Sequence, residues 1–295
     1  MARIADLLAA GRTFSFEFFP PKSDAAQLSL GRTIGELERL RPSFVSITYG
    51  AGGSTRQRTR DVVTWVHNEP AIPAMAHLTC VGHRRDEIVE LLAAYKDAGI
   101  ENILALGGDA PIDLASHVPM AVPSDYTYAI ELIDELESFE QFSIGVAAHP
   151  EGHPKSPDLA ADRRHLADKL RRADFAVTQF FFDVDHYRRL LDDLAHLGVH
   201  KPVVPGIMPI GNLTQVRRMA TMNGTDVPDW LAARMDGTAD GSEEMRRIGV
   251  EAATELCAAL LDAGAPGLHL YTLNRSATAR DIVANLGSAL VQPAP

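Results

Sequence analysis

The chain has 295 residues, of which 46% are hydrophobic and 23% are charged, as expected for a globular protein with a substantial core. Its formal net charge is −11, which argues against nucleic acid or an anionic membrane as a partner. No apolar stretch approaches the roughly 20 residues that a membrane-spanning helix requires. The opening MARIADLLAAGR lacks the long apolar core of a secretory signal, and the two lone cysteines, Cys80 and Cys257, are typical of a reducing compartment. We therefore expect a cytoplasmic protein.

Eight apolar runs of strand length are spaced along the chain, at residues 13–19, 43–49, 74–80, 102–108, 143–149, 175–181, 203–209 and 267–273. Most are followed by amphipathic stretches of helical length, at about 25–40, 55–68, 85–98, 125–138, 159–172, 184–197, 213–222, 242–263 and 276–286. Eight strand–helix units in a chain of this length predict an α/β protein, a single (β/α)8 TIM barrel over residues 1–295.

Two segments interrupt this alternation. Residues 110–124 form a Pro-rich loop after the fourth predicted strand, and residues 223–241 form a longer excursion before the helix that leads to the eighth. Both follow strand ends on the face where barrel loops carry function, so we expect either lids and substrate walls or surface decoration. The last residues, 288–295, are predicted to fray.

Side-chain alternation orients the first predicted strand. Phe14, Phe16 and Phe18 share one face, which suits packing against helices, so Glu17 is predicted to point into the barrel. No Lys or Arg stands at a facing strand end to neutralise it. A carboxyl group kept near-neutral in a partly dry site is suited to general acid catalysis, and the alternative is a core ion-pair partner.

Polar residues stand at or just after the ends of seven predicted strands: Glu17, Thr48, His77, Asp109, His149, Gln179 and Tyr271. Because the carboxyl ends of barrel strands form the active site of such enzymes, this set predicts the catalytic face. Any one of these residues alone could be a hydrogen-bonded core residue.

Other chemistries find little support. The HPEGH string at 149–153 contains Pro150 and Gly152, which rule out a zincin helix, and the first strand reads F-E-F instead of the H-x-H of metal-dependent barrel hydrolases. We therefore expect no metal. No G-x-G-x-x-G follows a strand, and no serine nucleophile elbow or Schiff-base lysine is recognisable.

Read in order, the strand-end strings FSFEFFPPK, VSITYGAGGSTR, HLTC, LALGGD, VAAHPEGHP, TQFFFD, PGIMPI and YTLNR closely resemble the methylenetetrahydrofolate reductases of the bacterial single-domain kind. The likeness extends from about residue 12 to 287. It implies reduction of 5,10-methylenetetrahydrofolate to 5-methyltetrahydrofolate by a reduced nicotinamide, NADH or alternatively NADPH. A folate-binding protein without turnover is a remote alternative.

The resemblance also assigns residues. Glu17 matches the catalytic acid that assists protonation at N10, and Asp109 matches an aspartate that faces the pterin and favours the N5 iminium cation. The expected folate contacts are Gln179, Gln215, Tyr271 and Thr48. The expected cofactor contacts are Thr48, His77, Gly107, Gly108, Asp109, Tyr128, Ala129, His149, His153, Asp162, His165 and Lys169.

The family normally binds FAD, but several flavin contacts differ here. Gly107 and Asp168 stand where the family has arginines, His149 replaces a tyrosine, and His165 replaces an asparagine. Two lost charged contacts would weaken diphosphate binding by roughly a thousandfold. The nearby arginines at 163, 164, 171 and 172 could compensate. We favour direct hydride transfer from NADH without bound flavin over the alternative, a ping-pong reaction relayed by FAD.

Overall fold

The computed structural model describes residues 2–50, 56–69, 72–111 and 120–290. The strands are β1 (Thr13–Phe18), β2 (Phe44–Ile47), β3 (Ala74–Thr79), β4 (Asn102–Leu106), β5 (Ser143–Ala148), β6 (Phe175–Thr178), β7 (Val203–Val204), β8 (Gly206–Ile207) and β9 (Gly267–Tyr271). The helices are α1 (Ile4–Ala10), α2 (Asp24–Glu38), α3 (Arg56–Asn68), α4 (Arg85–Asp97), α5 (Ala129–Glu137), α6 (Leu159–Leu170), α7 (Val184–His196), α8 (Leu213–Asn223), α9 (Asp229–Met235), α10 (Glu243–Asp262) and α11 (Ser276–Leu286).

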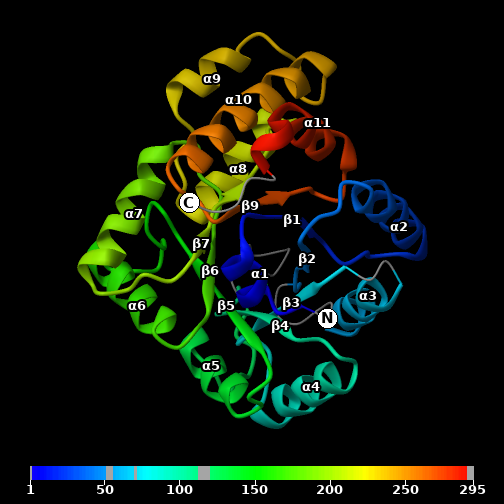
Figure 1. Ribbon diagram of the computed structural model, residues 1–295, viewed down its shortest axis with the longest axis vertical. Coiled ribbons are helices and arrows are strands. Elements are labelled where there is room, and N and C mark those ends of the chain that lie inside the picture. The colour runs from blue at the N-terminus through cyan, green and yellow to red at the C-terminus, as the bar shows by residue number, and fades with distance from the viewer. Residues whose placement is uncertain (1, 51–55, 70–71, 112–119, 291–295) are drawn as a thin grey trace.

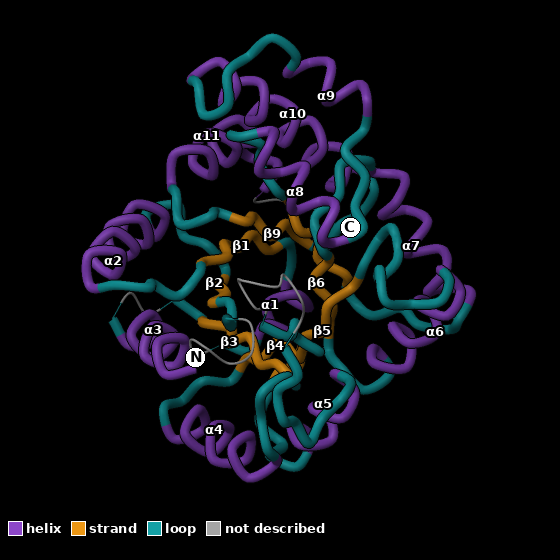
Figure 2. Tube along the Cα trace, turned by 180° about the vertical axis from the view of Figure 1, so that it is seen from behind, coloured by secondary structure: helices purple, strands orange, loops and turns teal. Residues whose placement is uncertain are grey.

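The strands form one parallel sheet in the order β7-β6-β5-β4-β3-β2-β1-β9-β8, and Figures 1 and 2 show that it curls into a ring surrounded by helices. β7 pairs with β6, and β8 pairs with β9. These two short strands are separated only by Pro205, which has no N–H to donate and whose carbonyl accepts a hydrogen bond from His269 N at 2.9 Å. They therefore share one position in the barrel, and the predicted (β/α)8 fold is confirmed.

Each predicted strand and helix is present, and the structure adds α1 and α9. Helix α1 lies over the centre of the ring in Figure 1, at the amino end of the strands. Its Ile4 and Leu8 pack on an inner cluster that includes Phe44, Met75 and Phe175. The amide of Ile4 donates to the buried Oδ1 of Asn102 at 2.7 Å, and that of Ala5 to Ser143 Oγ at 3.1 Å. The amino end of the barrel is thus closed by protein.

The predicted alternation of β1 holds. Phe16 and Phe18 are fully buried in the outer core between sheet and helices, with Leu30 and Ile34 of α2. Glu17, between them, points to the inside of the barrel, where its carboxylate meets side chains of β2, β3 and β9. Residue parity, set by the pleat of the strand, thus decides which side of the sheet receives the carboxylate.

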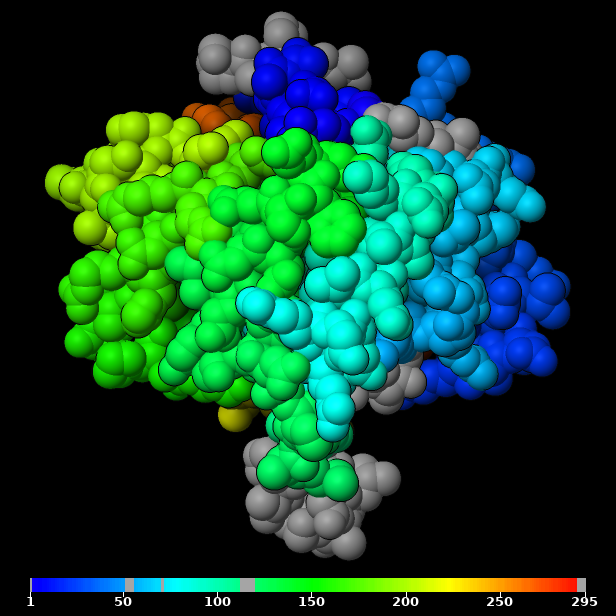
Figure 3. Space-filling view, turned by 90° about the horizontal axis from the view of Figure 1, so that it is seen from below, coloured from blue at the N-terminus to red at the C-terminus, as the bar shows by residue number. Residues whose placement is uncertain are grey.

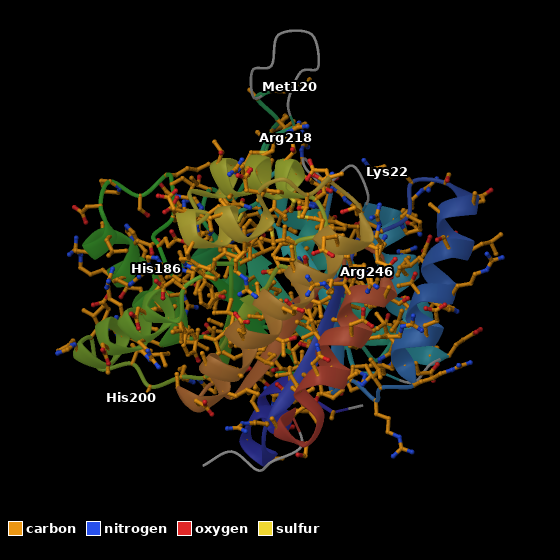
Figure 4. The ribbon with its side chains drawn as sticks, turned by 90° about the horizontal axis from the view of Figure 1, so that it is seen from above. Lys22, Met120, His186, His200, Arg218 and Arg246 are labelled. Atoms are coloured by element: carbon orange, nitrogen blue, oxygen red, sulfur yellow. The ribbon has the colours of Figure 1, made fainter. Side chains whose placement is uncertain are left out.

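The first predicted insertion, 110–124, lies largely outside the described residues. The residues described on either side of it project from the end of the barrel opposite α1, as Figure 3 shows. Figure 4 places Met120 on this projection, and Lys22 and Arg218 at the same end of the molecule. This is the carboxyl end of the strands.

The second insertion, 223–241, was expected to be an excursion without regular structure. It contains α9, whose Leu231 and Met235 are buried against Phe180 and Met208. At the end of the described chain, residues 287–290 form a 3-10 turn with Leu290 buried, so the prediction that the chain frays from 288 is wrong for residues 288–290; residues 291–295 lie outside the described part.

Candidate active site

The carboxylate of Glu17 lies at the centre of a ring of polar side chains inside the barrel. Its Oε2 is 3.4 Å from Ser46 Oγ, 3.4 Å from His269 Nε2 and 3.5 Å from His77 Nε2. The side chain is only 10% exposed. No Lys or Arg among the described residues forms an ion pair with it, in agreement with the sequence.

His77 does not supply the missing charge. Burial lowers the pKa of its imidazole to about 4, although the neighbouring Glu17 acts in the opposite direction. At neutral pH the ring is therefore uncharged. Its Nε2 has no hydrogen-bond partner among the described residues, so the contact with Glu17 is dipolar. His77 therefore places no full positive charge beside the carboxyl group.

Beneath Glu17 lies a buried chain of polar contacts that the predicted site set did not include. His269 is fully buried, with Nδ1 at 2.7 Å from Ser15 Oγ and Nε2 at 3.2 Å from Ser46 Oγ. Strand register explains the arrangement, because Glu17 lies opposite Ser46 on one side and Tyr271 on the other. The same alternation that turned Glu17 inward also turns these residues inward, which is the signal that could have identified them.

Tyr271 and Thr48 lie in the strands or strand ends next to Glu17. The Tyr271 hydroxyl donates to the carbonyl of Thr178 at 2.7 Å, and burial raises its pKa well above the ordinary value, with a smaller contribution from Glu17. Thr48 is buried just after β2, and its amide donates to Phe18 O at 2.9 Å. Tyr271 is thus the register neighbour of Glu17, and Thr48 is hydrogen-bonded through its backbone to the residue that follows Glu17.

The turn after β4 carries Gly107, Gly108 and Asp109. A side chain at Gly108 would be impossible, because its φ is +81° and a Cβ would lie 2.7 Å from that of Thr79. Gly107 is different, since a Cβ there would meet nothing within 4 Å. The local structure would therefore accept a side chain at position 107 and does not require glycine there.

Asp109 projects into solvent, with 86% of its side chain exposed, and forms an ion pair with Lys155 at 3.3 Å. Lys155 lies in the loop after β5, which also contains His149 and His153. The lysine was not among the predicted site residues, because nothing local in the sequence connects positions 46 residues apart.

His149 and His153 stack edge to face, with ring centroids 4.5 Å apart. Burial lowers the pKa of His149 to about 3, and His153, Lys169 and Arg163 act in the same direction. Lys169 Nζ donates to Ala147 O at 3.0 Å, and burial lowers the pKa of its ammonium group. His149 is thus neutral at physiological pH, and the cation at 169 is turned into the protein.

The arginines that could replace the missing ones are mostly engaged. Arg163 is buried and binds Asp162, Asp193 and the carbonyls of His149 and Pro150. Arg172 pairs with Asp134 and Glu137.

Asp168 lies exposed on α6 and pairs with Arg171 at 2.5 Å. This ion pair partly neutralises the charge of the Asp168 carboxylate. It also engages Arg171, another arginine that could have replaced a missing one. Asp162, at the buried face of α6, accepts from Ser156 Oγ at 3.4 Å. His165 is exposed on the same helix.

The remaining predicted contacts fall on loops and helix starts. Gln179 follows β6 and its Oε1 accepts from the amide of Phe180 at 3.0 Å. Gln215 is exposed in the first turn of α8. Tyr128 is 68% exposed at the N-cap of α5, directly before the buried Ala129. The structure thus places Glu17 beside His77 and, in strand register, beside Tyr271, puts Thr48 just after β2, and leaves Asp109, Gln215 and Tyr128 exposed.

None of the described helices is long and apolar enough to cross a membrane. Within the same residues, no cluster of three or more His, Cys, Asp or Glu side chains could hold a metal ion.

Comparison with known proteins agrees with the strand-end strings. A sequence model described as methylenetetrahydrofolate reductase matches residues 3–287. The 5,10-methylenetetrahydrofolate reductases of Pectobacterium carotovorum and Escherichia coli K12 are each 35% identical over 274 residues, covering 92% of this chain and 89% and 90% of theirs. Methylenetetrahydrofolate reductase (NADH) 1 of Arabidopsis thaliana is 36% identical over 298 residues, covering 97% of this chain but 50% of its own length.

Among solved structures, a Clostridium thermocellum protein described as binding two copies of 5-methyl-5,6,7,8-tetrahydrofolic acid has a TM-score of 0.60 and 14% identity, with 97% of each chain covered. At this identity the likeness supports the fold alone. The match across the sequence establishes more: this chain belongs to the methylenetetrahydrofolate reductase family.

Proposed function

We propose that the protein reduces 5,10-methylenetetrahydrofolate to 5-methyltetrahydrofolate, with hydride delivered directly from NADH. The observation that carries this proposal is Glu17, a carboxyl group inside the barrel that is surrounded by Ser46, His77 and His269 and that forms no ion pair with a Lys or Arg of the described residues. Family membership and the names of the bacterial and plant relatives support the substrate and the donor. The folate bound by the Clostridium protein is consistent with a pterin site in a barrel of this kind.

The reaction requires a proton at N10 of the folate. When Glu17 donates it, the bond between N10 and the one-carbon bridge breaks and the electrons of N5 form the N5 iminium cation. Hydride from C4 of NADH then adds to the bridging carbon, which becomes the methyl group, and NAD+ leaves. Glu17 recovers its proton from solvent. One proton and one hydride are consumed per turnover, so the reaction balances.

Asp109 is proposed to stabilise the iminium cation by charge attraction. Its carboxylate is exposed and stands at the same end of the barrel as the inward-facing site. Tyr271 and Thr48 would contact the folate from the strand ends next to Glu17, and Gln179 and Gln215 from the following loops.

The residues present do not fit the diphosphate of FAD. Open space at Gly107 replaces one arginine of the family, and a carboxylate already paired with Arg171 replaces the other. His149 is neutral, and Lys169 is bound to a backbone carbonyl. Because a diphosphate is held mainly by charge-assisted donors, these observations support a reaction in which both substrates bind together.

The test is to purify the protein without added flavin, record its visible spectrum and measure NADH oxidation with methylenetetrahydrofolate. We expect a colourless, active enzyme with intersecting double-reciprocal lines. A yellow chromophore near one per chain, together with parallel lines, would support the alternative of an FAD relay, which the retained Asp162 and Lys169 favour. If the protein oxidised no NADH, whether it was colourless or yellow, the reductase function would be contradicted.

A further inference from the structure

We infer that His269 is a positioning residue for Glu17: with Ser46 it donates hydrogen bonds to Oε2, so that the transferable proton of Glu17 is carried on Oε1. This inference rests on the proposed function and extends it to residues that do not touch the substrate. Its basis is the buried chain from Ser15 through His269 to Glu17.

The tautomer of His269 follows from the contact on its other nitrogen. The single hydroxyl hydrogen of Ser15 has two possible acceptors, the Leu268 carbonyl oxygen at 3.3 Å and Nδ1 of His269 at 2.7 Å, and the contact with Nδ1 is much the shorter. A separation of 2.7 Å is the usual one for a hydroxyl donor, whereas ring N–H donors are most often 2.9–3.0 Å from their acceptors. We therefore assign the hydroxyl proton of Ser15 to Nδ1. A ring that accepts at Nδ1 carries its own proton on Nε2.

That Nε2–H faces Glu17 Oε2 at 3.4 Å and Ser46 Oγ at 3.2 Å. The Ser46 hydroxyl in turn donates to the same carboxyl oxygen at 3.4 Å. Two donors on Oε2 make it the acceptor oxygen of the acid, so the acidic hydrogen belongs on Oε1. None of the described residues hydrogen-bonds Oε1, which leaves that oxygen available to the substrate.

The arrangement favours the transition state over the ground state. As the proton leaves Oε1, negative charge develops on the carboxyl group, and hydrogen bonds to Oε2 strengthen. His269 is fully buried and held from both sides, so it needs no reorganisation during the reaction. Removing its donor should therefore reduce kcat and leave folate binding nearly unchanged.

The experiment uses two substitutions of similar size. In His269→Gln the amide nitrogen falls near the position of Nε2 and can still donate to Glu17, whereas in His269→Asn the amide reaches only the Ser15 side. We expect His269→Asn to lower kcat by roughly tenfold to a hundredfold, as for one charge-assisted hydrogen bond, with KM for the folate unchanged within about twofold. His269→Gln should stay within about threefold of the wild type. A wild-type kcat in His269→Asn, or an equal loss in both variants, would overturn the inference.

A double variant separates positioning from packing. When Glu17→Gln has removed the acid, adding His269→Asn should cause little further loss, whereas a packing role would reduce activity equally in both backgrounds. If both His269 variants fail to fold, Ser15→Ala takes their place: a loss of kcat of about tenfold at constant KM supports the inference, and wild-type kcat overturns it. Wild-type protein without reductase activity would refute the proposed function and this inference together, whereas normal kcat in His269→Asn refutes the inference alone.

Discussion

The carboxylate of Asp109 is paired with the ammonium group of Lys155 at 3.3 Å, across two loops at the carboxyl end of the barrel. Both side chains are mostly exposed, so the attraction between them is weak and sensitive to salt. The lysine nevertheless competes with any cation that Asp109 is meant to stabilise.

Replacing Lys155 should therefore help the reaction. We expect Lys155→Gln to raise kcat/KM for the folate at low ionic strength, by no more than about fivefold, because exposed pairs are weak. Asp109→Asn should lower kcat/KM for the folate by about tenfold or more, since the negative charge that attracts the iminium cation is lost. Steady-state kinetics at two salt concentrations provide the measurement. A decrease in Lys155→Gln would mean that the lysine itself binds substrate.

Gly107→Arg should increase affinity for FAD. The open space around the Gly107 Cβ position allows the side chain without backbone strain. One restored charge-assisted contact predicts a gain in FAD affinity of roughly tenfold to a hundredfold, measured by quenching of flavin fluorescence. Gly107→Gln is the matched control, since it adds a side chain of similar reach without charge. Equal affinities of the two variants would exclude the loss of charge at 107 as the cause of weak flavin binding.

Three histidines make the fold sensitive to mild acid. Burial lowers the pKa of His77 and His83 to about 4 and that of His149 to about 3, from the ordinary value of 6.5. Above pH 6.5 these histidines are neutral in both the folded and the unfolded chain, so they do not make the free energy of unfolding depend on pH. Between about 6.5 and 4 only the unfolded chain takes up the protons, and the free energy of unfolding falls as pH falls.

The variant His149→Phe isolates one of these protons and keeps a ring against His153. Its free energy of unfolding should fall less steeply below pH 6, by up to about 1.4 kcal/mol per pH unit. Urea denaturation at pH 5, 6 and 7.5 measures the difference. Identical slopes in the two proteins would show that His149 titrates normally in the folded state.

Glu17→Gln should abolish most of the activity and leave the fold intact. The amide keeps the size of the side chain and can accept at its oxygen, but it has no proton to transfer to N10. The loss of general acid catalysis predicts a kcat lower by about a hundredfold to ten-thousandfold. NADH binding and the thermal unfolding midpoint serve as controls. If kcat were retained, the acid would have to be another group.

Much of the barrel could be predicted because its strands and helices are long and periodic. The helices that the sequence did not reveal are seven residues each, and both depend on distant contacts. α1 is held by Asn102 and Ser143, and α9 by the cluster around Phe180 and Met208. A short amphipathic segment does not carry enough periodic positions to be distinguished from a loop.

Of the candidate site, the direction in which Glu17 points was predictable. Alternation along β1 oriented Glu17 correctly because the strand has one apolar face. Alternation along a strand does not predict which side chains of different elements contact one another. The contact of Asp109 with Lys155 and that of Asp168 with Arg171 depend on loop paths and on the face of α6, and the hydrogen bonds of His269 depend on strand register.

The route of the hydride tests the account most directly. The protein would be given NADH carrying deuterium at both C4 positions, with methylenetetrahydrofolate in ordinary water, and the methyl group of the product would be analysed by mass spectrometry. Direct transfer predicts one deuterium in every product molecule, because the hydride never meets an exchangeable site. A product methyl group without deuterium would show that the hydride passed through a carrier that exchanges with water, as reduced flavin does, and would contradict the account.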